Sequence, residues 1–350
     1  MSARIIDIAK AAEVSPSAVS LALNNKSGVS GELRERIQDI AKDMGYRSVA
    51  RQEGRGAAGS VKLLKIAKHG HVVNERHNAF ITEYLEGIEQ GAKRRNYTLE
   101  VSFFNRTPVE KIVEEELRAG GNKGAGGLIV LGTELSAHEL SFFTALTRPT
   151  VFIDTCFPLT VFDCVDMDNG DGVFRSIEYF YRMGHRSIGL VKSSYETRNF
   201  KEREEGFREA MEYFSLPVQE DFIIAVDPAY EQAAGDMARF LERTGLRAGG
   251  KTPFPSAFFC MNDIIAYGCM KALREKGFAI PGDVSVIGFD DLPSSSVTDP
   301  PLTSIRVSTR QIGGRALEKL SERIEGSADG RPEKILVSGT LMVRGSVKKL

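Results

Sequence analysis

The chain has 350 residues, of which 42% are hydrophobic and 27% are charged. This ordinary globular composition excludes a largely disordered chain, and the length suggests two or three domains. No apolar run approaches the roughly 18 residues of a membrane span, and residues 1–7 lack the apolar core of a signal peptide. We therefore expect a cytoplasmic protein with no membrane partner.

The cysteines predict neither a disulfide framework nor a zinc site. Cys156, Cys164, Cys260 and Cys269 lie in apolar segments and form no CxxC pair, so we expect buried thiols and no bound metal. The formal net charge is −1, and residues 1–60 hold nine Lys and Arg against seven Asp and Glu. This small positive excess permits DNA binding by the first 60 residues but does not demonstrate it.

Residues 4–46 are expected to form short helices. Ser15 is a suitable N-cap and Pro16 suits the first position of a helix over residues 16–23, and a third helix is expected over residues 31–44. The residues that would project from the second helix are Ser17, Ser20 and Leu21. This arrangement is typical of a helix-turn-helix whose second helix enters a DNA major groove. A small helical bundle without DNA explains the spacing equally well.

Residues 48–60 are rich in Gly and Ala and predict a linker. Beyond it, short apolar runs alternate with segments of helical period, which predicts βαβ units and a mainly parallel sheet. The alternation continues in the second half, where helices are expected over residues 172–183, 203–213, 233–243 and 264–276. We therefore predict two α/β lobes, with a ligand in the crevice between them.

One segment matches an enzyme motif. GLRAGGKT at residues 245–252 satisfies the phosphate-loop pattern G-x4-G-K-[ST]. It follows an expected helix and runs into Pro253, whereas a phosphate loop joins a strand to a helix whose N-terminus holds the phosphate. We therefore interpret it as a surface loop. The sequence shows no nucleophile elbow, HExxH motif or dinucleotide fingerprint, so neither an enzyme nor a cofactor is predicted.

Several ordered motifs resemble those of one protein family. They are IDIAKAAEVSPSAVSLALN at residues 6–24, VSGELRERI at 29–37, MGYR at 44–47, DMDNG at 166–170, MGHRSI at 183–188, IGFDD at 287–291, PPLTSI at 300–305 and LMVRGS at 341–346. With these motifs, the chain resembles the LacI/GalR family of bacterial transcription regulators over nearly its whole length.

The resemblance implies a helix-turn-helix headpiece over residues 1–47, a linker over 48–60 and an effector-binding core over 61–350. The core would resemble a periplasmic sugar-binding protein, with three chain crossings between two doubly wound lobes. One lobe would comprise residues 61–161 and 291–324, and the other residues 162–290 and 325–350.

The implied function is that of a regulator, in the first place a repressor, which binds duplex operator DNA as a homodimer or a tetramer. A small effector, namely a sugar, a sugar acid or a sugar phosphate, would change its affinity for the operator. The alternative is a cytoplasmic sugar-binding or sugar-modifying protein whose headpiece has another role.

The recognition helix carries the residues that the resemblance assigns to DNA. They are Ser15, Pro16, Ser17, Ser20, Leu21 and Asn24. Leu21 stands where many relatives have arginine. Because an apolar side chain can contact a thymine methyl but cannot form a bidentate bond with guanine, the operator should differ at that step.

The linker departs from the family pattern. Related regulators carry a leucine that wedges into the minor groove and kinks the duplex, and counting from Tyr46 places Arg55 at this position. Arg47, Arg51 and Arg55 can still attract the minor groove electrostatically. We therefore expect this protein to bend its operator less than relatives that carry the wedge.

Four core positions match ligand-contacting residues of the family's sugar regulators, namely Asp154, Arg203, Asn262 and Asp290. The guanidinium would fork onto hydroxyls or a carboxylate, and the other side chains would bond to hydroxyls at strand ends. Each of them is also explained as a cap of a strand or a helix. Asp263 in particular is expected to be the N-cap of the following helix.

The segment after the first core strand, KIAKHGHVVNERHN at residues 65–78, is basic and departs from the family. Its basic residues at the expected mouth of the crevice are Lys68, His69, His71, Arg76 and His77. Basic residues of the opposite lobe would complete a cationic pocket, namely Lys192, Arg198 and Arg203. Such a pocket suits an anionic effector. A solvated basic loop explains the segment equally well, and a metal site of the three histidines is a third explanation.

Overall fold

The computed structural model describes residues 30–43, 59–68, 78–119, 126–246, 254–327 and 330–350, together with Gly249 and single positions between residues 9 and 22. The chain divides into two compact units, residues 1–56 and residues 57–350. The division falls inside the expected linker. Within the described part of the chain, no helix combines the length and the apolarity needed to cross a bilayer.

The first unit has a small apolar core. Its best-described element is the helix α3 (Gly31–Asp43), which matches the expected third helix. The Ser30 hydroxyl accepts from the Leu33 amide at 3.3 Å, as an N-cap does. The core consists of the buried side chains of Ala9, Ala12, Val19, Ala22, Ile37 and Ala41. The residues predicted to contact DNA lie outside the described positions, namely Ser15, Pro16, Ser17, Ser20, Leu21, Asn24, Arg47, Arg51 and Arg55.

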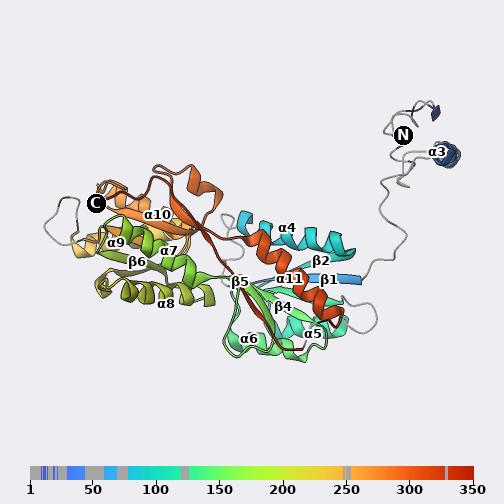
Figure 1. Ribbon diagram of the computed structural model, residues 1–350, viewed down its shortest axis with the longest axis horizontal. Helices are drawn as coiled ribbons and strands as arrows, with labels where there is room; N and C mark the ends of the chain where they lie inside the picture. Colours follow the sequence, from blue (N-terminus) through green and yellow to red (C-terminus); the bar gives the residue numbers. More distant parts are fainter. Residues whose placement is uncertain are drawn as a thin grey trace. The chain divides into compact units, whose positions relative to one another are not determined.

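The second unit contains two lobes, each built on a six-stranded sheet (Figure 1). In lobe 1 the strand order is β11-β5-β4-β3-β1-β2, and all pairs are parallel. The strands are β1 (Gly59–Ala67), β2 (Tyr97–Asn105), β3 (Gly127–Leu131), β4 (Thr150–Ile153), β5 (Asp163–Met167) and β11 (Lys334–Val337). The helices are α4 (Asn78–Arg95), α5 (Val109–Ala119), α6 (Ala137–Phe142) and α11 (Thr309–Ile324), with the short helix η2 (Phe143–Ala145).

The helices of lobe 1 cover both faces of its sheet, as a parallel sheet requires. Buried residues of α4 and α11 pack on one face, and those of α5 and α6 pack on the other. The helices α4 and α11 lie side by side (Figure 1). Their backbones approach closely at Gly87, where an added Cβ would lie 2.0 Å from the Arg310 carbonyl oxygen.

In lobe 2 the strand order is β12-β10-β9-β8-β6-β7, and β12 is antiparallel to β10. The strands are β6 (Ile188–Ser193), β7 (Ile223–Val226), β8 (Ala257–Cys260), β9 (Ser285–Asp290), β10 (Thr303–Arg306) and β12 (Thr340–Met342). The helices are α7 (Asn169–Arg182), α8 (Arg198–Tyr213), α9 (Tyr230–Thr244) and α10 (Asp263–Glu275), with η3 (Glu220–Phe222) and η4 (Pro293–Ser296).

The chain crosses between the lobes three times, after β5, after β10 and after β11. The crossings therefore follow residues 167, 306 and 337, and not the expected boundaries 161/162, 290/291 and 324/325. Residues 163–167 stay in lobe 1 because β5 pairs with β4. Residues 291–306 stay in lobe 2 because β10 pairs with β9, and residues 334–337 return to lobe 1 because β11 pairs with β5.

Two further expectations are confirmed. All four cysteines are buried free thiols. The segment with the phosphate-loop pattern follows α9, whose C-cap is Gly245 with φ +66°, and it precedes a strand, β8, instead of a helix. Among the described residues on either side of this segment, no helix begins that could hold a phosphate.

Candidate functional site

A small pocket lies between the two lobes and has a volume of about 50 Å³. Lobe 1 contributes Phe80, Ile81, Thr133, Asp154 and Met167 to its wall. Lobe 2 contributes Thr197, Asn199, Phe200, Arg203, Asn262 and Asp290. Many of these residues follow the carboxyl ends of strands, which is where ligands bind in α/β proteins. This pocket lies in the crevice where the sequence predicts a ligand.

The structure brings together four of the residues predicted to bind the effector: Asp154, Arg203, Asn262 and Asp290 all line this pocket. It places Lys68 elsewhere, in a neighbouring hollow of about 390 Å³ that also contains Arg198 and Lys201. His69, His71, Arg76 and His77 lie outside the described residues, and so does the metal site considered for the three histidines.

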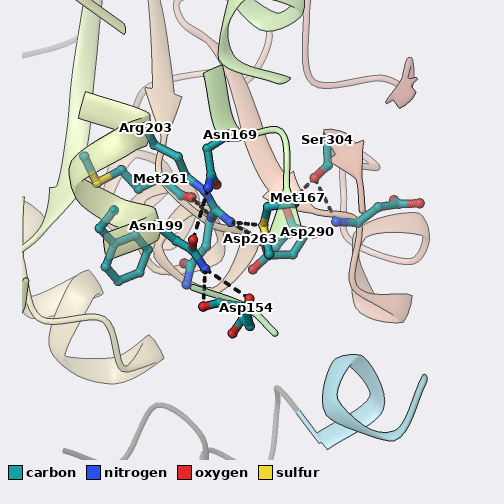
Figure 2. A network of polar contacts seen from close by, with 12 residues as sticks. Asp154, Met167, Asn169, Asn199, Arg203, Met261, Asp263, Asp290 and Ser304 are labelled. Atoms are coloured by element: carbon teal, nitrogen blue, oxygen red, sulfur yellow. Dashed lines mark hydrogen bonds and ion pairs between the residues drawn. The ribbon is translucent and has the colours of Figure 1, made fainter. Parts of the chain in front are cut away.

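Arg203 is the centre of a polar network in the pocket wall (Figure 2). Its Nε donates to Asn169 Oδ1 at 2.9 Å and its Nη1 donates to the Met261 carbonyl oxygen at 2.6 Å. Its Nη2 lies 3.3 Å from Asp290 Oδ1, and the guanidinium lies 3.8 Å from the centre of the Phe289 ring. Each guanidinium nitrogen thus already has a partner in the protein, so the expected free fork for a carboxylate is not present.

Asp154, on the opposite lobe, is buried and accepts hydrogen bonds from neutral groups. Tyr84 Oη and Asn199 Nδ2 each donate to Oδ1 at 3.0 Å, and the Thr133 hydroxyl donates to Oδ2. Burial raises the pKa of Asp154 to about 6 and the nearby carboxylate of Asp290 adds to this rise, while the hydroxyl donors and Arg203 oppose it.

Asp154 and Asp290 share an unusual backbone conformation. Their φ angles are +60° and +106°, a region that residues other than glycine rarely adopt. Such conformations cost on the order of 1–3 kcal/mol each and occur most often at functional sites. Both residues stand at the end of a strand and both line the pocket, so this strain is located where a ligand would bind.

Asn262, and not Asp263, is the N-cap of α10, which corrects the expectation for Asp263. The Asn262 Oδ1 accepts from the Ile265 amide at 2.9 Å. Its Nδ2 is buried and finds no acceptor among the described residues. A buried donor without a partner is costly, so this N–H group is available to an oxygen of a ligand.

Asp263 instead stabilises the chain beyond β9. Its carboxylate accepts from the Leu292 amide at 2.7 Å and from the hydroxyls of Ser295 and Ser304 at 2.6 Å. Burial raises the pKa of Asp263 to about 8, with a further contribution from Asp290. The residue therefore fixes the strand end that carries Asp290.

The expected cationic pocket does not form among the described residues. Lys68 Nζ pairs with Glu139 at 2.6 Å, Lys192 Nζ with Glu204 at 2.8 Å, and Arg198 Nε with Glu202 at 2.7 Å. Since each of these cations has its own carboxylate, they offer little attraction to an anion. The sequence could not reveal these partners because they come from other turns or elements.

Sequence reasoning also missed Asn169, Asn199, Thr133 and Tyr84. Asn169 is the first residue of α7 and lies within the quoted DMDNG motif at residues 166–170, which was the one available signal. Asn199 lies in the first turn of α8, which begins at Arg198, before the expected start at residue 203.

Comparisons with known proteins agree with this geometry. Residues 4–48 match the family described as bacterial regulatory proteins, lacI family, and residues 177–347 match the periplasmic binding protein-like domain. The chain belongs to the LacI/GalR family. As a member of this family, it is a DNA-binding transcription regulator with a ligand-binding core, and not an enzyme. The match at residues 4–48 argues against the alternative of a sugar-binding protein whose headpiece has another role.

Curated relatives are similar over almost the whole chain. The chain is 29% identical to the HTH-type transcriptional repressor PurR of Haemophilus influenzae strain PittEE, over 99% of both chains. It is also 29% identical to the PurR repressor of Actinobacillus pleuropneumoniae serotype 3, again over 99% of both.

Solved structures share the fold. The complex of the transcriptional regulator CelR with cellobiose has a TM-score of 0.70 at 23% identity, covering 98% of this chain and 99% of the other. The Lac repressor dimer bound to operator and the anti-inducer ONPF has a TM-score of 0.70 at 21% identity, covering 99% and 100%. At these identities the likeness shows the architecture of a headpiece followed by a two-lobed core.

Proposed function

We propose that the protein is a cytoplasmic repressor that binds a roughly palindromic duplex site as a homodimer and changes its affinity when a small hydroxylated metabolite binds between the lobes. The observation that carries the effector site is the convergence of Asp154, Arg203, Asn262 and Asp290 on one pocket, with Asn262 Nδ2 unpaired. A dimer is favoured because one small headpiece contacts too little of the groove for specific binding.

The pocket favours an uncharged, sugar-type effector over a sugar acid or a sugar phosphate. Among the described residues that line it, two are carboxylates, Asp154 and Asp290, and one is a cation, Arg203, which pairs with Asp290. Hydroxyl groups can donate to the carboxylates and accept from Asn262 Nδ2, whereas a buried anion would have no cation of its own.

A planar base such as a purine is the competing effector class. Phe80 of lobe 1 and Phe200 of lobe 2 both line the pocket. Aromatic faces hold planar rings well. The similarity of this chain to the relatives named PurR supports a purine as a candidate effector.

The DNA-binding proposal is tested by gel shifts with duplexes from the region upstream of the protein's own coding sequence, with random duplex as competitor. We expect preferential binding that weakens steeply as salt rises, because phosphate contacts release counterions. Substitution of Ser17 or Leu21 by alanine should reduce the preference, because both are expected on the recognition helix. Equal affinity for upstream and random duplex would contradict the proposal, and so would a monomer in sedimentation.

The effector proposal is tested by calorimetry with ribose, cellobiose, gluconate, glucose 6-phosphate and adenine as probes. We expect binding of at least one neutral sugar and none of the two anions. Asn262→Asp is the matched variant, because its carboxylate can still cap α10 but no longer donates. It should weaken binding about tenfold, equivalent to about 1.4 kcal/mol. Lys68→Ala, outside the pocket, is the control. Binding of adenine alone would identify the competing class, and binding of only the anions would overturn the proposal.

A further inference from the structure

A row of hydrogen bonds runs through buried side chains from Arg203 to Asp154 (Figure 2). Arg203 Nε donates to Asn169 Oδ1 at 2.9 Å. Asn169 Nδ2 donates to Asn199 Oδ1 at 3.1 Å, and Asn199 Nδ2 donates to Asp154 Oδ1 at 3.0 Å. We call these four residues the donor chain. Each is at most 6% exposed.

The donor chain has one direction only. A guanidinium can only donate, and an ionised carboxylate can only accept. The two amides must therefore both turn their oxygen towards Arg203 and their nitrogen towards Asp154. Hydrogen bonds that follow one another in this way polarise and strengthen each other inside a protein. Asn169 also donates to Glu202 Oε2 at 2.8 Å, which fixes its amide in the same orientation.

The last link of the donor chain joins the two lobes directly. Asn199 belongs to α8 of lobe 2, and Asp154 follows β4 of lobe 1. The Asn199 amide donates a second hydrogen bond to the Asp154 backbone oxygen at 3.2 Å. Beside it, Arg198 Nε donates to the Cys156 backbone oxygen at 3.2 Å. The first turn of α8 thus holds the strand end of the opposite lobe.

Both ends of the donor chain line the pocket. We propose that Asn169 and Asn199 are positioning residues that couple occupancy of this pocket to the separation of the lobes. A ligand group that binds Asp154 or moves Arg203 removes the donor or the acceptor on which the next amide depends, and the bond between the lobes is lost. The inference rests on the proposed function for the identity of the site, whereas the link itself can be tested without any effector.

The test is Asn199→Asp in the full-length protein. The new carboxylate faces Asp154 and replaces a donor by an acceptor, so the lobes should separate. Spin labels on Ser141→Cys in α6 and Glu209→Cys in α8 report the distance between the lobes, since both positions are exposed and the native cysteines are buried. Labelled protein is diluted with unlabelled protein to isolate distances within one subunit. We expect the distance distribution to move to longer values.

The exchanged pair Asp154→Asn with Asn199→Asp is the decisive control. It restores one donor and one acceptor across the lobes, with Asn169 still able to donate to position 199. The short distance should therefore return, a rescue that a merely structural role for Asn199 does not predict. Gln232→Glu, an amide-to-acid change on the exposed face of α9, should leave the distances unchanged.

Operator affinity gives a second readout. If the donor chain transmits occupancy, Asn199→Asp should change affinity for the preferred duplex by about 5- to 150-fold, the usual range of coupling between sites. The exchanged pair should reverse the change. An unaltered distance in a folded Asn199→Asp protein, or an exchanged pair that stays open, would overturn the inference.

Two outcomes are kept distinct. If Asn199→Asp does not fold, Asn169→Ser is the second variant, because it breaks the donor chain without adding charge. It should give the same longer distance between the lobes. An unchanged distance in this variant counts against the inference. If the distance between the lobes changes as expected but the wild-type protein shows no preference among duplexes, the proposed function is wrong. The inference about the donor chain is then still supported.

Discussion

Asp290 and Asp291 are neighbours at the end of β9, yet their carboxylates belong to different ion pairs. Asp290 lies beside Arg203 in the wall of the pocket. Asp291 accepts from Arg306 Nε at 2.7 Å and from Arg344 Nη2 at 2.6 Å. Arg306 ends β10 just before the crossing to lobe 1, and Arg344 follows β12 just after the last crossing. Two adjacent residues thus connect the pocket with two of the three crossings.

The first prediction concerns Asp291→Asn. Asparagine has one acceptor oxygen for two guanidinium groups, so one arginine loses its bond to this side chain. The Asp291 side chain is only 2% exposed, and we expect the free energy of unfolding to fall by about 2 kcal/mol in urea titrations. Asp171→Asn, which breaks an i,i+4 pair with half-exposed Arg175, should cost less than about 1 kcal/mol. Equal losses in the two variants would contradict the prediction.

The second prediction is a pH dependence caused by Asp154. Its pKa is raised from 3.8 to about 6, so the folded protein holds this proton more tightly than the unfolded chain does. The contribution of Asp154 to the free energy of unfolding should therefore fall as the pH rises from about 4 to about 6. At higher pH this contribution should remain constant. The groups that face it are Tyr84, Thr133, Asn199, Arg203, Asp166 and Asp290.

Asp154→Asn removes this titration and is the comparison that isolates it. The difference in free energy of unfolding between wild type and variant should change by about 3 kcal/mol across that pH interval. Carboxyls that do not face Asp154, Asp263 included, titrate alike in both proteins and cancel in the difference. Chemical denaturation at pH 4, 5, 6 and 7 measures it, and a difference that is constant with pH would show that Asp154 is not the group responsible.

The third prediction concerns the close packing behind β9. A Cβ on Gly288 would lie 2.2 Å from Asp263 Oδ1 and 2.9 Å from Leu302 Cδ2. Asp263 cannot move aside without losing its three hydrogen bonds, so Gly288→Ala should cost about 3 kcal/mol. Gly235→Ala on α9 meets only the end of the flexible Arg239 side chain at 3.4 Å and should be neutral or stabilising by up to about 1 kcal/mol. Thermal unfolding of both variants checks the contrast.

The fourth prediction concerns the linker at residues 48–60. With arginine at position 55 in place of a wedging leucine, the operator should be bent less than by relatives that carry the wedge, and Arg55→Leu should increase the bend. Circular-permutation gel shifts measure both angles. A sharp kink with the native linker would mean that another residue supplies the wedge.

Local signals in the sequence determined much of this protein. Apolar runs alternating with helical segments predicted two α/β lobes, because strand and helix periods are properties of neighbouring residues. The third helix was expected over residues 31–44 for the same reason, and α3 spans Gly31–Asp43. The four pocket residues Asp154, Arg203, Asn262 and Asp290 came from the resemblance to the family's sugar regulators, and all four line one pocket.

Tertiary structure decided which strands pair and which charges meet. The sheet to which β5, β10 and β11 belong depends on their hydrogen-bonding neighbours, and sequence proximity does not report these. The free cations expected at residues 68, 192 and 198 each have a carboxylate partner, which for Lys68 lies 71 residues away. The donor chain links residues 154, 169, 199 and 203 through hydrogen bonds of about 3 Å, two of them between α7 and α8 of lobe 2 and the last one between the lobes. Contacts across such separations depend on the packing of whole elements, and no local pattern encodes them.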